Sequence, residues 1–290
     1  MQKTTIQQRR LHDGKRERTA GGIPSGTAPG GTGAGTIEKY LRDVAAFGAW
    51  LGRRPLCKEE VSAWKGELAG RGYAPVTINS MLAALNRYLR FIGREECRAG
   101  FLKIQRKVFR DAGRELTKQE YQRLIAAAAA QGKARLALLM ESIGATGIRV
   151  SEVRYLTVEA ARQGRAEVAL KGKIRTILLP GKLRRKLLKY AGAQKIASGA
   201  IFRTGSGRCL SRRQIWAEMK GLCRPAGVEP SKVFPHNLRH LFAVTFYRVS
   251  RDVAKLADLL GHASIETTRI YLLSTGREHA KQLARLGLVG

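Results

Sequence analysis

The chain has few cysteines, no long apolar run and no recognisable metal-ligand spacing. Its four cysteines are scattered over 290 residues without a C-x-x-C pair, which argues against a zinc module or a disulfide scaffold and is typical of a reducing compartment. No apolar stretch approaches the ~18 residues of a membrane span, and the first thirty residues have no apolar block of a signal peptide. These absences predict a cytoplasmic protein.

Acidic residues are also scarce. Asp and Glu number 22 against 54 Lys and Arg, so the net charge is +32 and the isoelectric point is about 10.9. Such a charge nearly excludes an ordinary metabolic enzyme and indicates a polyanionic partner, most simply nucleic acid. The 44% of hydrophobic residues excludes a wholly disordered chain. The length suggests two domains, each able to bury a core.

The first 115 residues divide into three segments. Residues 1–35 are rich in glycine with a basic beginning and lack apolar periodicity, which predicts a flexible basic tail. Residues 36–102 predict a small helical domain, because apolar residues recur at steps of three and four, with Thr36 as an N-cap and Pro75 opening a helix. Residues 103–115 predict a basic linker, in which Lys103, Arg106, Lys107 and Arg110 are expected to contact the polyanionic partner.

The remaining residues, 116–290, predict a mixed α+β domain. Thr117 and Glu120 form a capping box ahead of a helix over 118–130. A second helix is expected over about 133–143, ending near Gly144, and another from near Arg149. Two strand-like runs, 166–170 and 174–179, flank a tight hairpin. Helices follow over about 181–191, 211–224, 236–249, 251–260 and 264–273. The predicted fold is mainly α with a small antiparallel β-sheet.

Several polar residues stand where they can bind a phosphate. Arg149 follows a Gly turn at a helix start, where a guanidinium joins amide groups suited to an anion, or is simply a surface arginine paired to Glu152. His236 and Arg239 share one helix face at spacing i, i+3, although a polar surface face has the same pattern. His240 points away from that face and is interpreted as structural.

Two more features complete the candidate set. His262 follows Gly261, the expected C-cap of the helix over 251–260, and Tyr271 comes nine residues later. A tyrosine in that position is more commonly a packed aromatic. Lys171 and Lys173 stand at the hairpin tip, where a lysine is either a solvated turn residue or a group that reaches into a DNA groove.

The order of these features resembles the tyrosine recombinases, the phage integrase family, and specifically a compact two-domain member. The resemblance covers essentially all of the chain after the tail. It rests on four segments in order: TGIRVSE at 146–152, KGKIR at 171–175, HNLRHLFA at 236–243, and LLGH at 259–262 running to Tyr271. The hairpin is one residue longer than in many relatives, so Lys171 aligns best as the catalytic lysine while Lys173 stays open. Many relatives also carry a His two residues after the tyrosine, where this chain has Leu273.

The resemblance implies a catalytic set and a mechanism. Tyr271 attacks a DNA phosphorus and forms a 3′-phosphotyrosyl bond, which stores the phosphodiester energy without ATP. Arg149 and Arg239 stabilise the transition state, and His236 and His262 bind the same phosphate, one of them helping to remove the tyrosine proton. Lys171, or alternatively Lys173, protonates the leaving 5′-oxygen. No cofactor and no metal is expected.

The resemblance also implies partners and a role. The partner is double-stranded DNA, held by a homotetramer on two sites that exchanges strands through a Holliday junction; the free chain is expected to be a monomer or a weak oligomer associated with the nucleoid. Residues 274–290 are expected to dock on a neighbouring protomer. An accessory directionality factor is a partner that the resemblance allows.

Alternatives at the level of function remain. Integration or excision of a mobile element or phage is favoured weakly by the long Gly-rich tail, with resolution of chromosome dimers as the alternative. A type IB topoisomerase uses similar chemistry on one duplex, although the helical domain and the segment after Tyr271 favour recombination. A non-catalytic DNA-binding protein with the same fold is the alternative from a different class.

Overall fold

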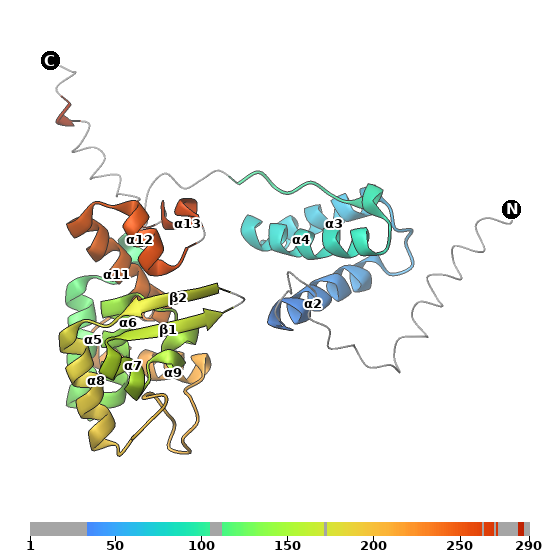
Figure 1. Cartoon of the computed structure of the whole chain (residues 1–290). Coiled ribbons are helices and arrows are strands. Elements are labelled where there is room, and N and C mark those ends of the chain that lie inside the picture. The colour runs from blue at the N-terminus through green and yellow to red at the C-terminus, as the bar shows by residue number, and fades with distance from the viewer. Residues whose placement is uncertain are drawn as a thin grey trace, which may run out of the picture. The chain divides into compact units, whose positions relative to one another are not determined.

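Figure 1 shows the computed structural model of the chain, which describes residues 34–104, 112–170, 173–262, 264–269, 271 and 284–286. The chain divides into two compact units at residues 105 and 106. The N-terminal tail, most of the predicted linker, Lys171 and nearly all of the segment 274–290 lie outside the described residues. Within the described part of the chain, no helix has the combined length and apolar character needed to cross a membrane.

The described residues of the first unit, 34–104, form three helices and a short 3-10 turn. Its elements are α2 (Ala34–Leu51), α3 (Lys58–Gly70), α4 (Pro75–Phe91) and η1 (Glu95–Cys97). The predicted apolar stripes meet in a buried core that includes Trp64 and Leu82. Pro75 opens α4 as predicted, because its fixed φ suits the first helical position. The prediction of Thr36 as an N-cap was wrong, since α2 already begins at Ala34.

The second unit opens with η2 (Ala112–Arg114) and the antiparallel pair α5 (Lys118–Ala130) and α6 (Ala134–Thr146). The capping box before α5 is confirmed: the Thr117 hydroxyl accepts from the Glu120 amide at 3.1 Å, and the Glu120 carboxylate accepts from the Thr117 amide at 2.8 Å. Helix α6 runs beyond the predicted end at Gly144. It ends instead at Gly147, whose φ of 65° places it in the left-handed region that terminates helices.

A short stretch after α6 departs from the predicted pattern. The helix expected from Arg149 is the 3-10 helix η3 (Val150–Tyr155), and it is followed by the short helix α7 (Val158–Gln163), which periodicity did not indicate. The two predicted strands are present as β1 (Arg165–Leu170) and β2 (Lys173–Leu178), which pair antiparallel with Arg165 opposite Leu178. The predicted fold class, mainly α with a small antiparallel sheet, is confirmed.

The remaining elements are helical. They are α8 (Gly181–Ala193), α9 (Arg212–Lys220), α10 (Cys223–Ala226), η4 (Pro230–Lys232), α11 (Pro235–Ser250), α12 (Val253–Leu260) and α13 (Ile265–Arg269). Two predicted ends were too long: the helix expected over 211–224 stops at Lys220, and the one expected over 264–273 has its described end at Arg269. Tyr271 therefore lies in a turn, where its amide donates to the Thr268 carbonyl at 3.0 Å.

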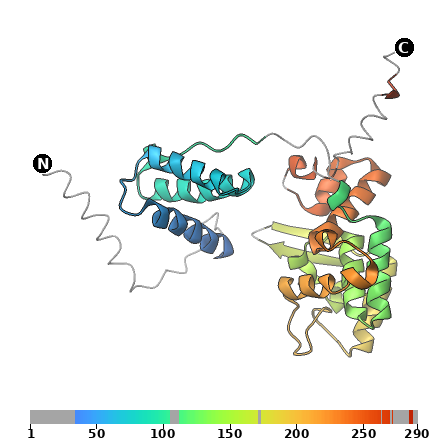
Figure 2. The same cartoon turned by 180° about the vertical axis from the view of Figure 1, so that it is seen from behind.

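Packing within the second unit brings the ends of three helices together. Helix α11 packs against α6, and α12 packs against α11. Figure 1 and the opposite view in Figure 2 show the small sheet between α12 and α13 on one side and α7 on the other. As a result, the end of α6, the start of α11 and the end of α12 meet at one place. These are the segments that carry Arg149, His236 with Arg239, and His262.

Candidate active site

The C-terminal end of α12 is the organising element of the site. Its last carbonyls have no partner within the helix and carry the negative end of the helix dipole. Three consecutive carbonyls accept from three arginines: Leu259 O from Arg175 at 2.8 Å, Leu260 O from Arg239 at 2.7 Å, and Gly261 O from Arg149 at 3.3 Å. The helix end therefore gathers cations that would otherwise repel one another.

Arg239 is the most enclosed of these arginines, with 2% of its surface exposed. Its guanidinium also donates to the Gly147 carbonyl and approaches the His262 Nε2 at 3.0 Å. Burial, followed by the charge of Arg149, lowers the pKa of Arg239 to about 10. The side chain is therefore still protonated at neutral pH, and its nitrogens are fixed before any substrate binds.

Arg149 is held by Glu152 but remains accessible. The Glu152 carboxylate accepts from the Arg149 amide at 2.8 Å and from its Nη1 at 2.9 Å. The Arg149 side chain is 41% exposed, whereas that of Glu152 is 1% exposed. Burial opposes ionisation of Glu152, but hydrogen bonds from Arg149 and Arg175 outweigh it and lower its pKa. Both readings of Arg149 made from the sequence are thus present at once: it pairs with Glu152 and it faces a pocket.

The hydrogen bonds of His262 define its protonation. Because arginine has no acceptor, the contact with Arg239 requires His262 Nε2 to accept, and the proton then resides on Nδ1. That nitrogen lies 2.8 Å from the hydroxyl of Thr268, which is fully buried. Burial, then the charges of Arg239, Arg149 and nearby cations, lowers the pKa of His262 to about 4. His262 is therefore neutral at physiological pH, with its lone pair at Nε2.

Tyr271 is buried beside His262. The tyrosine is 3% exposed, and its ring lies 6.0 Å from the His262 ring at an interplanar angle of 16°. On another side it meets His240, with ring centroids 5.0 Å apart. His240 itself contacts the Glu115 carboxylate at 3.0 Å. The interpretation of His240 as structural stays a prediction, although this contact with Tyr271 gives it a place next to the candidate nucleophile.

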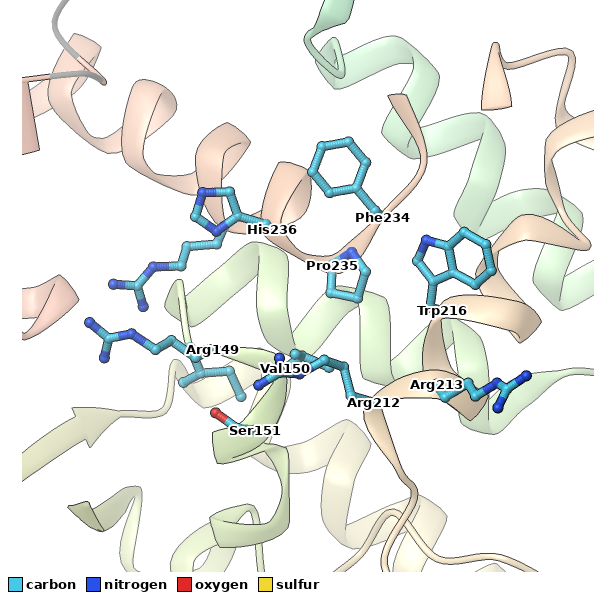
Figure 3. A pocket seen from close by; sticks show the side chains of 11 residues that line it. Arg149, Val150, Ser151, Arg212, Arg213, Trp216, Phe234, Pro235 and His236 are labelled. Carbon is cyan, nitrogen blue, oxygen red and sulfur yellow. The ribbon is translucent and has the colours of Figure 1, made fainter. Parts of the chain in front are cut away.

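A pocket of about 800 Å³ opens in front of these residues (Figure 3). Arg149 and His236 lie at one end of it, and Trp216 and Arg213 lie at the other. Neighbouring atoms partly shield the His236 ring from water and, together with the charges of Arg239, His240 and Arg149, lower its pKa. The lining is cationic and apolar, with no Asp or Glu: Ile148, Arg149, Val150, Ser151, Arg212, Arg213, Trp216, Phe234, Pro235, His236 and Arg239.

Sequence reasoning missed the wall of the pocket formed by Arg212, Arg213 and Trp216. All three belong to the first turns of α9, and Trp216 is 47% exposed. The available signal was the pair of arginines behind the Ser211 cap, followed by an aromatic at the next turn. It was passed over because basic pairs are common throughout a chain of net charge +32.

For the other predicted residues, the described part of the chain gives no position relative to this pocket. Lys171 lies outside the described residues, and Lys173 begins strand β2 without a described side chain. Lys103 belongs to the first unit and is exposed. Arg106, Lys107 and Arg110 lie outside the described part of the chain.

A helical unit followed by a unit in which arginines, histidines and a tyrosine converge is the arrangement expected of an enzyme that cuts and rejoins DNA strands. Residues 114–277 match the model of the phage integrase family, and residues 30–96 match the phage integrase N-terminal SAM-like domain. The chain therefore belongs to the phage integrase family and is a tyrosine recombinase.

Curated relatives are similar along most of the chain. Tyrosine recombinase XerD of Brucella suis biovar 1 (strain 1330) is 30% identical over 274 residues, which cover 84% of this chain and 88% of the relative. Tyrosine recombinase XerA of Pyrococcus furiosus is 31% identical over 266 residues, which cover 89% of this chain and 90% of the relative.

Solved structures share the fold at lower identity. A lambda integrase dimer bound to a COC′ core site has a TM-score of 0.68 at 19% identity and covers 92% of this chain and 94% of its own. The Tn1549 transposon integrase in complex with transposon right end DNA has a TM-score of 0.69 at 15% identity and covers 89% of this chain and 95% of its own.

Proposed function

We propose that this protein is a site-specific DNA recombinase that cuts duplex DNA through Tyr271 and rejoins it to a second duplex. The observation that carries the proposal is the convergence of Arg149, Arg239 and His236 on one cationic pocket, with His262 and Tyr271 directly behind Arg239. A single DNA phosphate in that pocket would meet Arg149, Arg239 and His236, with His262 and Tyr271 next to Arg239.

The two arginines act on the phosphate. When Tyr271 Oη attacks phosphorus, negative charge develops on the non-bridging oxygens, and fixed guanidinium groups stabilise it without reorganising. Arg239 is fixed by the carbonyls of Gly147 and Leu260. Arg149 is fixed by Glu152 while its side chain stays accessible to the incoming phosphate.

The two histidines differ in protonation and role. His262 is neutral, with a lone pair on Nε2 and its ring next to that of Tyr271, so it is the candidate for removing the tyrosine proton. His236 lines the pocket and is the candidate for a hydrogen bond to a non-bridging oxygen. Lys171 is proposed to protonate the leaving 5′-oxygen, with Lys173 as the alternative.

Tyr271 is buried next to Arg239. It is 3% exposed and packs with Ala243, Leu256 and Leu260, and its side chain interacts with the Arg239 guanidinium, which lines the pocket. Binding of DNA is proposed to loosen this packing so that Tyr271 Oη reaches the phosphate beside Arg239.

The rest of the charge is proposed to hold the DNA. Arg212 and Arg213 extend the pocket away from Arg149, so they are placed for the backbone phosphates next to the scissile one. Lys103, Arg106, Lys107, Arg110 and Lys173 are proposed as further backbone contacts. The active assembly is proposed to be a homotetramer on two duplexes, with residues 274–290 linking protomers.

The biological role is proposed to be integration or excision of a mobile element, with chromosome-dimer resolution as the second candidate. The relatives named XerD and XerA support the second, because they align over at least 84% of the chain. The transposon and lambda integrases share the fold, as do the XerA and XerH recombinases, all at 21% identity or less, so the fold fits either role, and the Gly-rich N-terminal sequence is what favours the first.

The test of the chemistry is a covalent adduct on DNA. Nicked duplexes from genomic and randomised libraries are incubated with the protein, denatured, and recovered by their attachment to it. We expect attachment through Tyr271 that is absent in Tyr271→Phe and retained in Tyr247→Phe, a control from the same aromatic cluster. Equal behaviour of wild type and Tyr271→Phe would leave a non-catalytic DNA-binding protein as the better proposal.

The recovered fragments also separate the remaining alternatives. Crossed products from two marked duplexes carrying the recovered site require recombination, whereas relaxation of a single supercoiled circle without them would indicate a type IB topoisomerase. Fragments from the boundary of a mobile element support integration and excision, and a single fragment of the host chromosome supports dimer resolution.

A further inference from the structure

Arg175 is a third arginine of the cluster for which the proposed reaction has no role. It lies on strand β2, outside the lining of the pocket, and its side chain is 15% exposed. It is not among the residues that line the pocket, and yet it contacts both of the segments that hold Arg149 and Arg239, which do line it.

One guanidinium joins two acceptors from distant parts of the chain. Arg175 Nη2 donates to the Glu152 carboxylate on η3, and Arg175 Nη1 donates to the Leu259 carbonyl at 2.8 Å on α12. Its Nε is buried and has no hydrogen-bond partner among the described residues. The planar guanidinium holds its N–H donors in fixed, divergent directions, so one Arg175 side chain can link the Glu152 carboxylate to the Leu259 carbonyl.

Each end of the bridge leads to a phosphate-binding group. Glu152 also holds the backbone and side chain of Arg149. The carbonyl of Leu259 is followed by those of Leu260 and Gly261, which accept from Arg239 and Arg149, and then by His262. A shift of either end therefore moves the groups that face the pocket.

The backbone at Gly261 is shaped around Arg175. Gly261 has a φ of 63°, and a Cβ added there would lie 2.4 Å from Arg175 Cδ. Real side-chain carbons do not approach each other so closely. The turn before His262 and the Arg175 side chain can therefore both keep their positions only when residue 261 is glycine.

We propose that Arg175 is a positioning residue for DNA cleavage, which holds Arg149 and the end of α12 in the geometry that binds the scissile phosphate. The proposal rests on the proposed function. Arg175 acts through Glu152 and the Leu259 carbonyl and makes no contact with the DNA itself.

Arg184 is a matched control elsewhere in the same unit. It also bridges helix-end carbonyls, donating to Ala161 at 3.0 Å and to Arg162 at 2.6 Å at the end of α7. A Cβ on Gly164, which has a φ of 82°, would lie 3.1 Å from its guanidinium. Arg184→Met thus removes the same charge and the same kind of bridge without touching the pocket.

The experiment uses the full chain and a nicked duplex carrying the site recovered above, with DNA affinity and the cleavage rate at saturation measured separately. Displacing catalytic groups by about 1 Å lowers rates by about 100-fold, and we expect a loss of that order in Arg175→Met with little change in affinity. Arg175→Lys keeps the charge but reaches one acceptor, so we expect an intermediate rate. Arg184→Met should cleave at the wild-type rate even if its melting temperature falls equally.

A second substrate separates positioning from general destabilisation. A methylphosphonate at the scissile position removes one negative charge, so the placement of the arginines matters less. We expect the loss in Arg175→Met and in Arg175→Lys to be smaller on this substrate than on phosphate. Wild-type cleavage by Arg175→Lys, or equal losses on both substrates, overturns the positioning role while the proposed function stands; absence of cleavage by the wild type overturns both.

Discussion

Arg149 and Arg239 carry the same charge but are held in different ways. Arg239 is 2% exposed and donates to two backbone carbonyls, so it is part of the interior as well as of the site. Arg149 has a 41% exposed side chain, which donates to the Glu152 carboxylate and, at 3.3 Å, to the Gly261 carbonyl. Removing Arg239 should therefore harm the fold, because buried carbonyls lose their donors, whereas removing Arg149 should leave the fold intact.

The Arg149→Ala substitution should stop cleavage while DNA binding persists. Removing one preorganised donor from a transition-state charge lowers the rate by about 100- to 1,000-fold. The measurement is the rate of covalent adduct formation at saturating protein. Lys103→Ala is the comparison, since it should weaken affinity and leave the saturated rate nearly unchanged; normal cleavage by saturated Arg149→Ala would contradict the assignment.

His262 should make the free energy of unfolding depend on pH. An unfolded histidine has a pKa of about 6.5, whereas that of His262 in the folded chain is lowered to about 4. Between these values the unfolded chain binds a proton that the folded chain does not, so this contribution to stability is present above about pH 6.5 and is lost as pH falls.

Chemical denaturation of wild type and His262→Gln between pH 7 and pH 4.5 measures this contribution. Groups common to both proteins cancel in the difference. We expect the wild type to lose more stability than the variant as pH falls. Parallel pH profiles would show that His262 is protonated equally in both states.

At the scale of elements, local signals were predictable and long-range ones were not. The capping box of Thr117 and the start of α4 at Pro75 depend on neighbours within one turn, and both followed from the sequence. The end of α6 was misplaced because Gly144 and Gly147 are equally plausible stops, and only Gly147 adopts a positive φ. The bridge of Arg175 spans 23 and 84 residues, beyond any periodicity.

The candidate site divides in the same way. The sequence segments around Arg149, His236 and Tyr271 were recognisable by residue type and order, because the chemistry requires arginine, histidine and tyrosine at those places. The wall of Arg212 and Trp216 was not, because its closeness to the pocket depends on how α9 packs against α6. The burial of Tyr271 likewise depends on α11 and α12, which form the cluster around it.

The end of α12 should be unusually sensitive to a single methyl group. Gly261→Ala places a Cβ 2.4 Å from Arg175 Cδ, whereas Gly132→Ala, at a φ of 67°, meets no atom within 4 Å. Both substitutions have the cost of a left-handed residue, about 1–2 kcal/mol. Denaturation of the two variants should therefore show a larger loss for Gly261→Ala, and its cleavage rate should fall as well. Equal losses would mean that the helix end adjusts freely.

For the whole molecule, the net charge of +32 has two separable parts. A few cations, Arg149 and Arg239 among them, are immobilised by carbonyls and a carboxylate around one pocket. Others, such as Arg212 and Arg213, are exposed and can contact the phosphates of the DNA backbone. The first part should govern rate, and the second should govern affinity and its dependence on salt.

The segment after Tyr271 belongs to assembly in this proposal. Deleting residues 277–290 should abolish tetramers on DNA and leave binding to a single site, because the deleted residues follow Tyr271, the last residue of the catalytic set. Analytical ultracentrifugation with a duplex carrying the recovered site measures both. Tetramers of unchanged stability would rule out a role of this segment in linking protomers.

The arginines of the exposed pocket wall, Arg212 and Arg213, should contribute to the salt dependence of DNA binding. Each phosphate contact contributes about −0.9 to the slope of log K against log salt concentration, because a cation that neutralises a phosphate releases a counterion. Arg212→Ala combined with Arg213→Ala should therefore make the slope shallower by about 2. Arg185→Ala combined with Lys189→Ala removes the same charge from exposed positions of α8 that do not line the pocket. We expect a smaller change there, and identical slopes for the two double variants would show that the wall by α9 contacts no phosphate.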